Sequence, residues 1–476
     1  MVIVIRKLSN SVLFSLQKQD FQKFQTQQGH LPIEIKDKEH KYNLTRLHNG
    51  LTILTETESF PGAVHMGVLV DVGSRDETPE TSGCLLALKN SFLKTSQHSN
   101  ETLNYNMIQM SGGDTTLEFD QERLYLKSHC IEYDAVDILN MIVDITTEPR
   151  IDVVGEIARF KNKKQHELFR HMSQFDPSSK VQEMLMKTAY GNGTLGMPIM
   201  GMEENVENIN GELLRSFVKQ HFTAERMMIV ANGIRNHDEF VQIVQDKINK
   251  TDIPQTSNYQ RQKAVYVGGE YRYLNEQAND IKIDLAFESV SWEDELVTAF
   301  YVMNTLIGNA TSFSSGGPGK GMYCRAITNL MQKYNFVDAA SAINSHYHET
   351  GLFGMSVQGP SQSAKHLSII LLDELIKLKQ KINDEELSRA KNILKMNILM
   401  AMERKEDRLE EIARNYMTYK KLTFMDYCNS IDKVTSEQIN KAAHKALSSK
   451  PTLIVSGNNI DQVPSFEQIH RYVNAS

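Results

Sequence analysis

The sequence predicts an α+β protein in which two homologous α/β-sandwich domains, each with a mixed sheet, are duplicated in one chain. Two observations lead to this prediction. The same order of strand-like and helix-like segments occurs in residues 41–250 and again in residues 266–476. Between them, residues 251–265 are polar, lack periodicity and contain Pro254, which is typical of a linker. A chain of 476 residues is also long enough to bury more than one hydrophobic core.

The first copy opens with a predicted β-hairpin. Residues 42–47 and 51–54 read as two short strands, and Asn49-Gly50 between them is a strong turn signal. The later periodic segments predict strands at 64–72, 123–127 and 227–231 and helices at 83–95, 133–145 and 213–221. Strands and helices therefore alternate along this half, as layers of sheet and helix require.

The second copy follows the same plan, although the two halves have diverged in sequence. Its periodic segments predict strands at 281–287, 353–357 and 452–456 and helices at 293–307, 361–378, 384–401 and 436–447. A strand followed by a long helix, as at 353–378, repeats the step from strand to helix at 123–145.

Composition and charge exclude several classes of protein. The chain carries 52 basic and 59 acidic residues, whereas proteins that bind nucleic-acid phosphates cluster Lys and Arg. The four cysteines are scattered and form no Cys-x-x-Cys pair, so neither a thiolate zinc site nor a disulfide framework is indicated. No apolar run approaches the roughly 20 residues that cross a bilayer. We therefore expect no nucleic-acid partner and no transmembrane segment.

The N-terminal segment differs in composition from the rest of the chain. Its first 30 residues carry Arg6, Lys7, Lys18 and Lys23 against the single acid Asp20. A basic, amphipathic and acid-poor stretch is typical of a mitochondrial presequence, and an ordinary flexible arm is the alternative. We interpret residues 1–40 as a presequence-like arm.

A glycine-rich loop is the most informative stretch of the sequence. Residues 311–325 read TSFSSGGPGKGMYCR, with alternate glycines at positions 317, 319 and 321 and a further glycine at position 316. Such a run disfavours helix and strand and leaves backbone groups bare for a ligand. A Walker motif would need glycine at position 314, where the chain has serine, and a dinucleotide fingerprint would need glycine at position 322, where it has methionine. Two interpretations of the loop remain open, contact with a substrate and a plain flexible connection.

Taken with its flanks, this loop resembles the glycine-rich loop of the alpha subunits of mitochondrial processing peptidases, a branch of the pitrilysin-type peptidases with an inverted zinc motif. The resemblance extends over nearly all of the chain beyond the first 40 residues, through the segments 49–51, 72–75, 194–196, 334–337 and 350–354. It implies that the substrate-binding residues are Gly316, Gly317, Pro318, Gly319, Lys320 and Gly321.

The helix predicted at 83–95 lies where active members of this family carry His-x-x-Glu-His, two zinc ligands and a general base. By this alignment the three positions hold Leu86, Lys89 and Asn90. Leucine has no donor atom, asparagine is a weak zinc ligand, and a protonated lysine cannot accept a proton from water. Glu167 alone remains, 77 positions after Asn90, near the place of the family's distal ligand. We therefore expect no bound metal or other cofactor and no catalytic residue in this chain.

A second histidine pair carries no prediction of function. His346 and His348 would share one face if the segment is a strand. No third ligand lies near them in the sequence, and surface histidines are commonly solvated or hydrogen-bonded. We assign them no role from the sequence.

The resemblance implies a non-catalytic subunit of a heterodimeric peptidase in the mitochondrial matrix. Its partner would be the zinc-bearing beta subunit of a mitochondrial processing peptidase, and its ligands the presequence peptides of imported precursors. Bare backbone groups of the loop can pair with an extended peptide whatever its sequence.

A structural alternative is a core subunit of respiratory complex III at the matrix face of the inner membrane, with cytochromes among its partners. One protein can carry both roles, and the intact loop favours a retained processing function. An active single-chain peptidase is disfavoured by Leu86, Lys89 and Asn90.

Overall fold

The computed structural model describes residues 42–58, 62–94, 101–147, 159, 161–170, 178–312, 322–420 and 425–475. Residues 41–476 form one compact unit, and the presequence-like arm lies outside the described residues. Within the described ranges, no helix is both long and apolar enough to cross a lipid bilayer.

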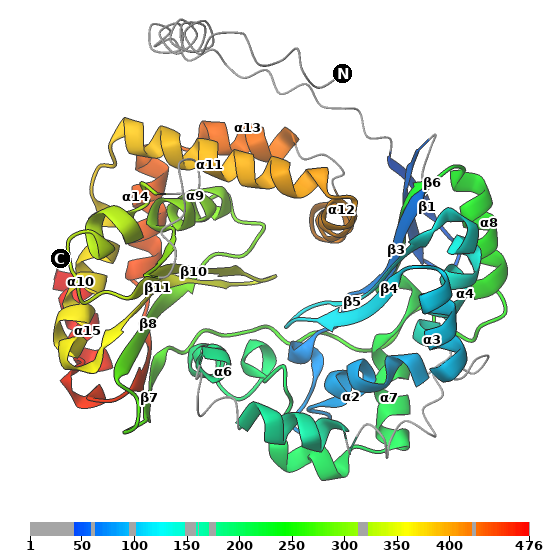
Figure 1. The fold of residues 1–476 in the computed structure, drawn as a ribbon, viewed down its shortest axis with the longest axis horizontal. Coiled ribbons are helices and arrows are strands. Elements are labelled where there is room, and N and C mark those ends of the chain that lie inside the picture. The colour runs from blue at the N-terminus through cyan, green and yellow to red at the C-terminus, as the bar shows by residue number, and fades with distance from the viewer. Residues whose placement is uncertain are drawn as a thin grey trace, which may run out of the picture. The chain divides into compact units, whose positions relative to one another are not determined.

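The first half forms one six-stranded mixed sheet in the order β1-β2-β6-β3-β5-β4 (Figure 1). Its strands are β1 (Tyr42–Arg46), β2 (Thr52–Thr57), β3 (Ala63–Val70), β4 (Asp114–Phe119), β5 (Leu124–Ile131) and β6 (Met227–Ile234). β2 and β6 run parallel, and all other neighbours are antiparallel. The predicted hairpin is confirmed: Arg46 pairs with Thr52, and Gly50 in the turn has a φ of +97°, which favours glycine.

The second half forms a sheet of the same design in the order β7-β12-β8-β11-β10-β9. Its strands are β7 (Gly269–Leu274), β8 (Asp280–Ser289), β9 (Asn309–Thr311), β10 (Ala339–His346), β11 (Gly351–Pro360) and β12 (Thr452–Gly457). β7 and β12 run parallel, as β2 and β6 do, and the remaining neighbours are antiparallel. Five strands of each sheet therefore match in order and direction, which confirms two homologous mixed-sheet domains.

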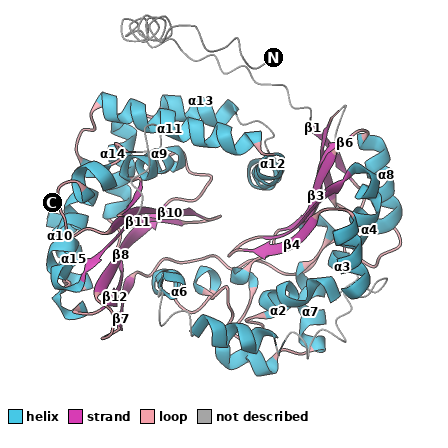
Figure 2. Cartoon of the chain, in the orientation of Figure 1, coloured by secondary structure: helices cyan, strands magenta, loops and turns pink. Residues whose placement is uncertain are grey.

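Helices surround both sheets (Figure 2). In the first half they are α2 (Cys84–Ser91), α3 (Glu101–Met110), α4 (Ala135–Thr147), α6 (Ser178–Tyr190), α7 (Gly211–His221) and α8 (His237–Ile248). In the second half they are α9 (Val297–Ile307), α10 (Ala364–Ile376), α11 (Asp384–Glu403), α12 (Lys405–Tyr419), α13 (Met425–Lys433), α14 (Ser436–Leu447) and α15 (Phe466–Ala475). The helices predicted at 83–95 and 361–378 are shorter than expected because 3₁₀ turns form at their ends, at Phe92–Lys94, Ser361–Ser363 and Lys377–Lys379.

One face of each sheet packs against helices of its own half. Alternate residues of β8, such as Ile283 and Phe287, are buried in a core with residues of α9, α10 and α14. Residues such as Val68 and Leu126 do the same in the first sheet, against α4 and α7. This alternation is the period-two pattern from which the strands were predicted.

The opposite face of each sheet is covered by a helix from the other half. Helix α12 of the second half packs on β2, β3, β5 and β6, and helix α6 of the first half packs on β8, β11 and β12. Figure 1 shows α12 beside β3 and β6. The first contact joins Leu54, Leu69, Tyr125, Met228 and Val230 to Leu409, Ile412 and Ala413. The second joins Val181, Leu185, Met186, Ala189 and Tyr190 to Ala286, Leu352 and Ile454.

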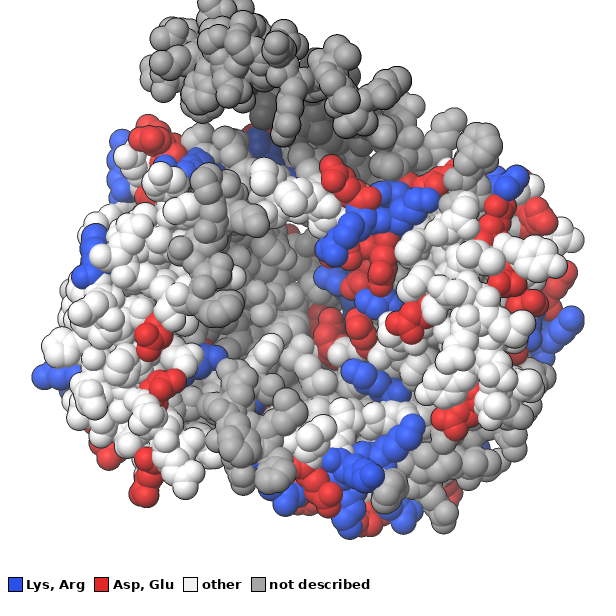
Figure 3. Space-filling model, in the orientation of Figure 1, with Lys and Arg blue, Asp and Glu red and all other residues white. Residues whose placement is uncertain are grey.

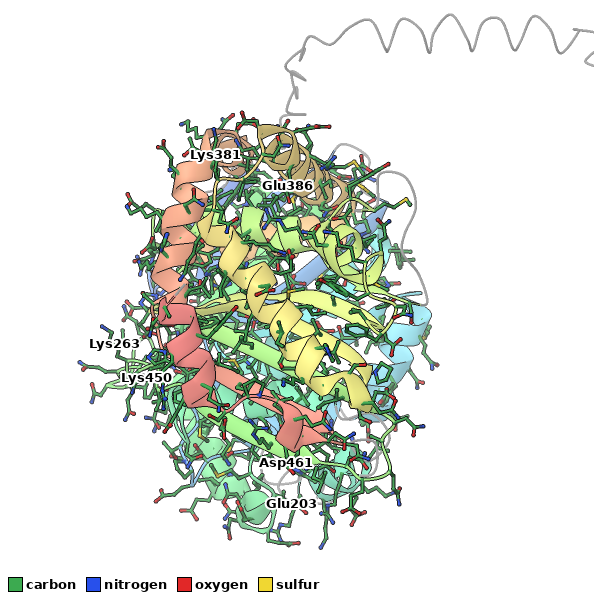
Figure 4. All side chains as sticks on the ribbon, turned by 90° about the vertical axis from the view of Figure 1, so that its left-hand side faces the viewer. Glu203, Lys263, Lys381, Glu386, Lys450 and Asp461 are labelled. Atoms are coloured by element: carbon green, nitrogen blue, oxygen red, sulfur yellow. The ribbon has the colours of Figure 1, made fainter. Side chains whose placement is uncertain are left out.

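The linker between the halves is held by ionic contacts. Arg261 donates two hydrogen bonds to the carboxylate of Asp76, at 2.8 and 2.7 Å. Burial opposes ionisation of Asp76, but Arg261 and Arg226 hold the pKa of its carboxyl below its usual range. Further along, Ala264 is buried in the apolar cluster that includes Ala286 and Ile454 of the second sheet, and Figure 4 shows Lys263 and Lys450 at the same edge. The linker therefore contacts both halves.

An ion pair anchors α12 on the first sheet. The Arg408 Nε atom lies 3.0 Å from Glu56 Oε2 on β2, and the two side chains are 6% and 3% exposed. An ion pair this deeply buried is costly to break because the remaining charge loses its partner.

We predict that Arg408→Met lowers the free energy of unfolding by about 3–5 kcal/mol, since it removes the guanidinium that lies 3.0 Å from the buried Glu56 carboxylate. Urea unfolding followed by circular dichroism measures the change. Arg404→Met is the matched control, because Arg404 immediately precedes the same helix and its side chain is 75% exposed, so its replacement should cost about 0.5 kcal/mol or less. Equal effects of the two substitutions would contradict the prediction.

Candidate functional site

Helix α2 is the element on which the family's zinc motif would lie. It begins after Gly83, whose φ of +95° favours glycine. The buried carboxyl of Glu77 accepts hydrogen bonds from the backbone amides of Gly83, at 3.0 Å, and Leu85, at 2.8 Å. Burial raises the pKa of Glu77 to about 8, although these amide bonds oppose the shift. Glu77 therefore acts as the cap of α2, because Gly83 has no side chain to do so.

The three residues at the zinc-motif positions make ordinary structural contacts. Leu86 is buried, with 2% of its surface exposed. The Lys89 ammonium lies 6.0 Å from the centre of the Phe119 ring. The Asn90 side-chain amide donates a hydrogen bond of 2.7 Å to the Asn162 side-chain oxygen. These contacts hold the helix in place and offer a metal ion no carboxylate, imidazole or thiolate at these positions.

Asn162, and not Glu167, faces α2 from the helical segment 161–170. Its amide also donates to the carbonyl of Gly83, at 3.3 Å. Glu167 is exposed, and its charge acts on the neighbouring Lys163. The expected distal carboxylate therefore does not point to Asn90, because its helix presents a different residue there. Across the described ranges, no three His, Cys, Asp or Glu side chains are grouped so that they could hold a metal ion.

The glycine-rich loop begins at the edge of the second sheet. Its predicted substrate-binding residues, Gly316, Gly317, Pro318, Gly319, Lys320 and Gly321, lie outside the described residues. On the N-terminal side, Thr311 of β9 pairs with Ala339 of β10, and the Ser312 amide donates to the Asp338 carbonyl at 2.7 Å. Strand β9 has no counterpart in the first sheet and serves as the starting point of the loop.

The C-terminal side of the loop is fixed by a forked ion pair. The Arg325 guanidinium donates to both oxygens of Glu386 on α11, at 2.6 and 3.0 Å. Figure 4 shows Glu386 beside the start of that helix. Cys324 is buried against Gly308, where a Cβ atom would lie only 2.5 Å from the Cys324 Cβ. Arg325 is part of the loop motif, but the sequence does not predict its partner, because Glu386 is 61 positions away.

An acidic cluster lies between the first sheet and α12. The ammonium of Lys127 is 3.1 Å from Glu118, 3.6 Å from Glu406 and 3.7 Å from Glu410. Glu410 also pairs with Arg414, at 2.7 Å, so three carboxylates face two basic side chains and leave an excess of one negative charge. Figure 3 shows acidic and basic side chains intermixed on one face of the molecule, without a broad basic patch in its middle.

Comparison with known protein families gives two matches that follow one another along the chain. The family model described as "Insulinase (Peptidase family M16)" matches residues 52–203. The model described as "Peptidase M16 inactive domain" matches residues 208–394. The first match contains α2 and the second contains the glycine-rich loop.

Curated relatives are similar over most of their length. The alpha subunit of mitochondrial-processing peptidase from Solanum tuberosum is 29% identical over 90% of this chain and 84% of its own. A probable beta subunit of the same peptidase from Arabidopsis thaliana is 26% identical over 90% of this chain and 80% of its own. Among solved structures, a chain of complex III2 from Candida albicans has the same fold, with a TM-score of 0.76 at 17% identity over 90% of this chain and 99% of that chain.

We predict that Glu386→Gln lowers the free energy of unfolding by about 1–3 kcal/mol, because it removes the charge from a hydrogen-bonded pair that is largely buried. Chemical denaturation measures the change. Glu385→Gln is the control, since Glu385 also lies in the first turn of α11 and shares the favourable interaction with the helix dipole. A loss no larger than that of the control would show that the fork does not hold the loop's end.

Proposed function

Because the chain belongs to the M16 peptidase family, we propose that it is a non-catalytic alpha subunit of a mitochondrial processing peptidase. One observation carries the proposal: the zinc-motif positions on α2 hold Leu86, Lys89 and Asn90, and Asn90 is bonded to Asn162. Likeness to relatives does not by itself separate alpha from beta subunits, because the alignments with both types cover 90% of this chain. The chemistry of α2 favours the alpha assignment. A protein of this kind binds no catalytic zinc and requires a partner that does.

We assign the contact with substrate to the glycine-rich loop, Gly316–Gly321. The anchored flanks support this assignment. Thr311 is bonded into the sheet edge and Arg325 is held by Glu386, so both ends of the loop are fixed on rigid elements. A loop with few side chains lets an extended peptide approach its backbone closely.

The acidic cluster around Lys127 supplies attraction for a basic presequence. Glu118, Glu406 and Glu410 carry three negative charges, against Lys127 at their centre and Arg414, which pairs with Glu410. Opposite charges of this kind increase the rate of encounter more than the final affinity. The cluster therefore acts as a steering surface in the proposed function.

The remaining parts of the proposal concern architecture, partner and place. We propose the domain bounds 41–250 and 266–476 with the linker 251–265, and the two sheets, Tyr42–Ile234 and Gly269–Gly457, lie within them. The partner is a zinc-bearing beta subunit, and the place of action is the mitochondrial matrix. The arm 1–40 acts as the targeting segment.

A second candidate is a structural core subunit of respiratory complex III at the matrix face of the inner membrane. The likeness of fold to a chain of complex III2, with a TM-score of 0.76, favours it. Purification from native membranes separates the two candidates: co-purification with cytochromes supports the core subunit, and a soluble complex with a beta chain supports the processing subunit.

We predict that the purified chain holds no stoichiometric zinc and cleaves no presequence peptide, because α2 supplies no zinc ligands at the motif positions. Elemental analysis of the metal content and a peptide cleavage assay test this. One tightly bound zinc per chain, with cleavage, would overturn the non-catalytic assignment.

We also predict that deletion of residues 316–321 weakens presequence binding by the heterodimer about tenfold or more, since it removes the backbone groups that pair with the peptide. Fluorescence anisotropy with a labelled presequence peptide measures the affinity. The zinc content of the beta subunit and the size of the complex are the controls and should not change. Unchanged affinity in an intact heterodimer would contradict the guiding role of the loop.

A further inference from the structure

A pocket of about 520 Å³ lies where α9, α11, α12 and α13 of the second half meet the turn between β4 and β5 of the first. Its volume falls in the range of sites that enclose small molecules, about 300–1,000 Å³. Aromatic side chains form much of its wall: Trp292, Tyr301, Tyr347, Tyr419 and Tyr427. Aromatic walls with a few convergent polar groups are typical of small-molecule sites.

Arg123 brings a positive charge to this pocket, near the carboxylates of Asp120 and Glu122 but without an ion pair to any described residue. Its residue surface is 9% exposed, and its guanidinium lies 4.5 Å from the centre of the Trp292 ring. It donates a hydrogen bond to the hydroxyl of Thr418, and it forms no ion pair with any residue in the described ranges. Burial and the neighbouring Arg414 lower the pKa of Arg123, but a guanidinium stays charged at neutral pH. A buried cation of this kind is costly unless something neutralises it.

The carboxylates that line the same pocket are each bonded elsewhere. Asp120 accepts hydrogen bonds from the backbone amides of Glu122, at 2.7 Å, and Arg123, at 2.8 Å. Glu122 pairs with the buried Arg75, and Glu411 lies 3.3 Å from Arg414. Asp120 keeps its negative charge, because backbone amides do not neutralise a carboxylate, and Arg414 is paired with Glu411. Among the described residues, the Arg123 guanidinium is therefore the cation of the lining that has no ion-pair partner.

His346, at the end of β10, adds a hydrogen-bond acceptor to the lining. Its Nδ1 atom lies 2.9 Å from the Val290 carbonyl oxygen. A carbonyl oxygen only accepts, so Nδ1 carries the proton and Nε2 presents a lone pair. The Nε2 atom is buried and has no hydrogen-bond partner among the described residues. Burial lowers the pKa of His346, which keeps the ring neutral and Nε2 an acceptor.

We propose that this pocket binds a small aromatic anion that carries one N–H or O–H donor. The anionic group pairs with Arg123, the flat body packs between the aromatic walls, and the donor bonds to Nε2 of His346. Arg123 disfavours a basic peptide in this pocket, although Arg414 of the lining also pairs with Glu410 of the acidic cluster around Lys127. The inference does not depend on the proposed peptidase function.

The single tryptophan of the chain allows a direct test. Trp292 lines the pocket, so quenching of its fluorescence reports binding at this site. The probe is 1-anilinonaphthalene-8-sulfonate, an aromatic anion with one N–H group, titrated into the full-length protein. N-phenyl-1-naphthylamine is the matched neutral probe, since it keeps the rings and the N–H and lacks the sulfonate. We expect one anionic probe to bind per chain with quenching of Trp292, about tenfold more tightly than the neutral probe.

Two variants separate the contributions of the two polar groups. Arg123→Met should weaken binding of the anionic probe about tenfold and leave the affinity for the neutral probe unchanged. His346→Asn keeps a donor toward Val290 and removes the Nε2 acceptor, because the asparagine side chain is shorter. The binding of both probes should therefore weaken by a similar factor of about three or more. Arg389→Met is the control, because Arg389 stacks on Tyr323, 5.3 Å from its ring centre, and neither residue lines the pocket.

Several outcomes would overturn the proposal. In the wild-type protein, equal affinity for the two probes, or anion binding without quenching of Trp292, would do so even if a variant fails to fold. Equal loss in Arg123→Met and Arg389→Met would show that Arg123 only anchors α12 through Thr418. Displacement of the anionic probe by a presequence peptide would assign the pocket to the peptide instead. Thermal unfolding of each variant confirms that the compared proteins are folded.

Discussion

The fold depends on one constraint: each sheet has two faces that must be covered, and neither half covers both faces of its own sheet. Helix α12 closes the first sheet, and helix α6 closes the second. Apolar residues such as Leu54 and Ile454 would otherwise be left in water, at a cost of about 25 cal/mol for each Å² exposed. This exchange of α6 and α12 between the halves makes their unfolding cooperative, because unfolding either half would uncover the sheet of the other.

The exchange also determines what stands near the junction of the halves. To reach the first sheet, α12 crosses from the second half, and its residues come to lie beside the turn that contains Arg123. The aromatic pocket forms at this crossing. The buried Arg75 joins the same region, since its guanidinium contacts Glu122 of the first half, Glu349 of the second and the linker carbonyl of Gln262. Charge networks of this kind fix the mutual orientation of packed elements.

At α2, two asparagine side chains join neighbouring helical segments. Asn90 and Asn162 are held together by a hydrogen bond of 2.7 Å. The helix keeps its place through the Glu77 cap and through buried Leu86.

Much of the fold was determined by the sequence alone, because burial between a sheet and its own helices leaves a regular pattern. The alternation of Ile281, Ile283, Leu285 and Phe287 predicts β8, and Asn49-Gly50 predicts the first hairpin. Leu86, Lys89 and Asn90 can likewise be read directly at the positions that the family resemblance implies, since that spacing is local. These features depend on neighbours within a few positions.

Only the tertiary structure decided which distant segments meet. Helix α12 is rich in charge and carries a narrow apolar stripe of Leu409, Ile412 and Ala413, which from sequence resembles a solvent-exposed helix. Asn162 instead of Glu167 faces α2, and Arg123 enters an aromatic pocket, for reasons that also lie far along the chain. Periodicity records that a residue is buried, but not what it is buried against. The partner depends on how the whole chain folds back on itself.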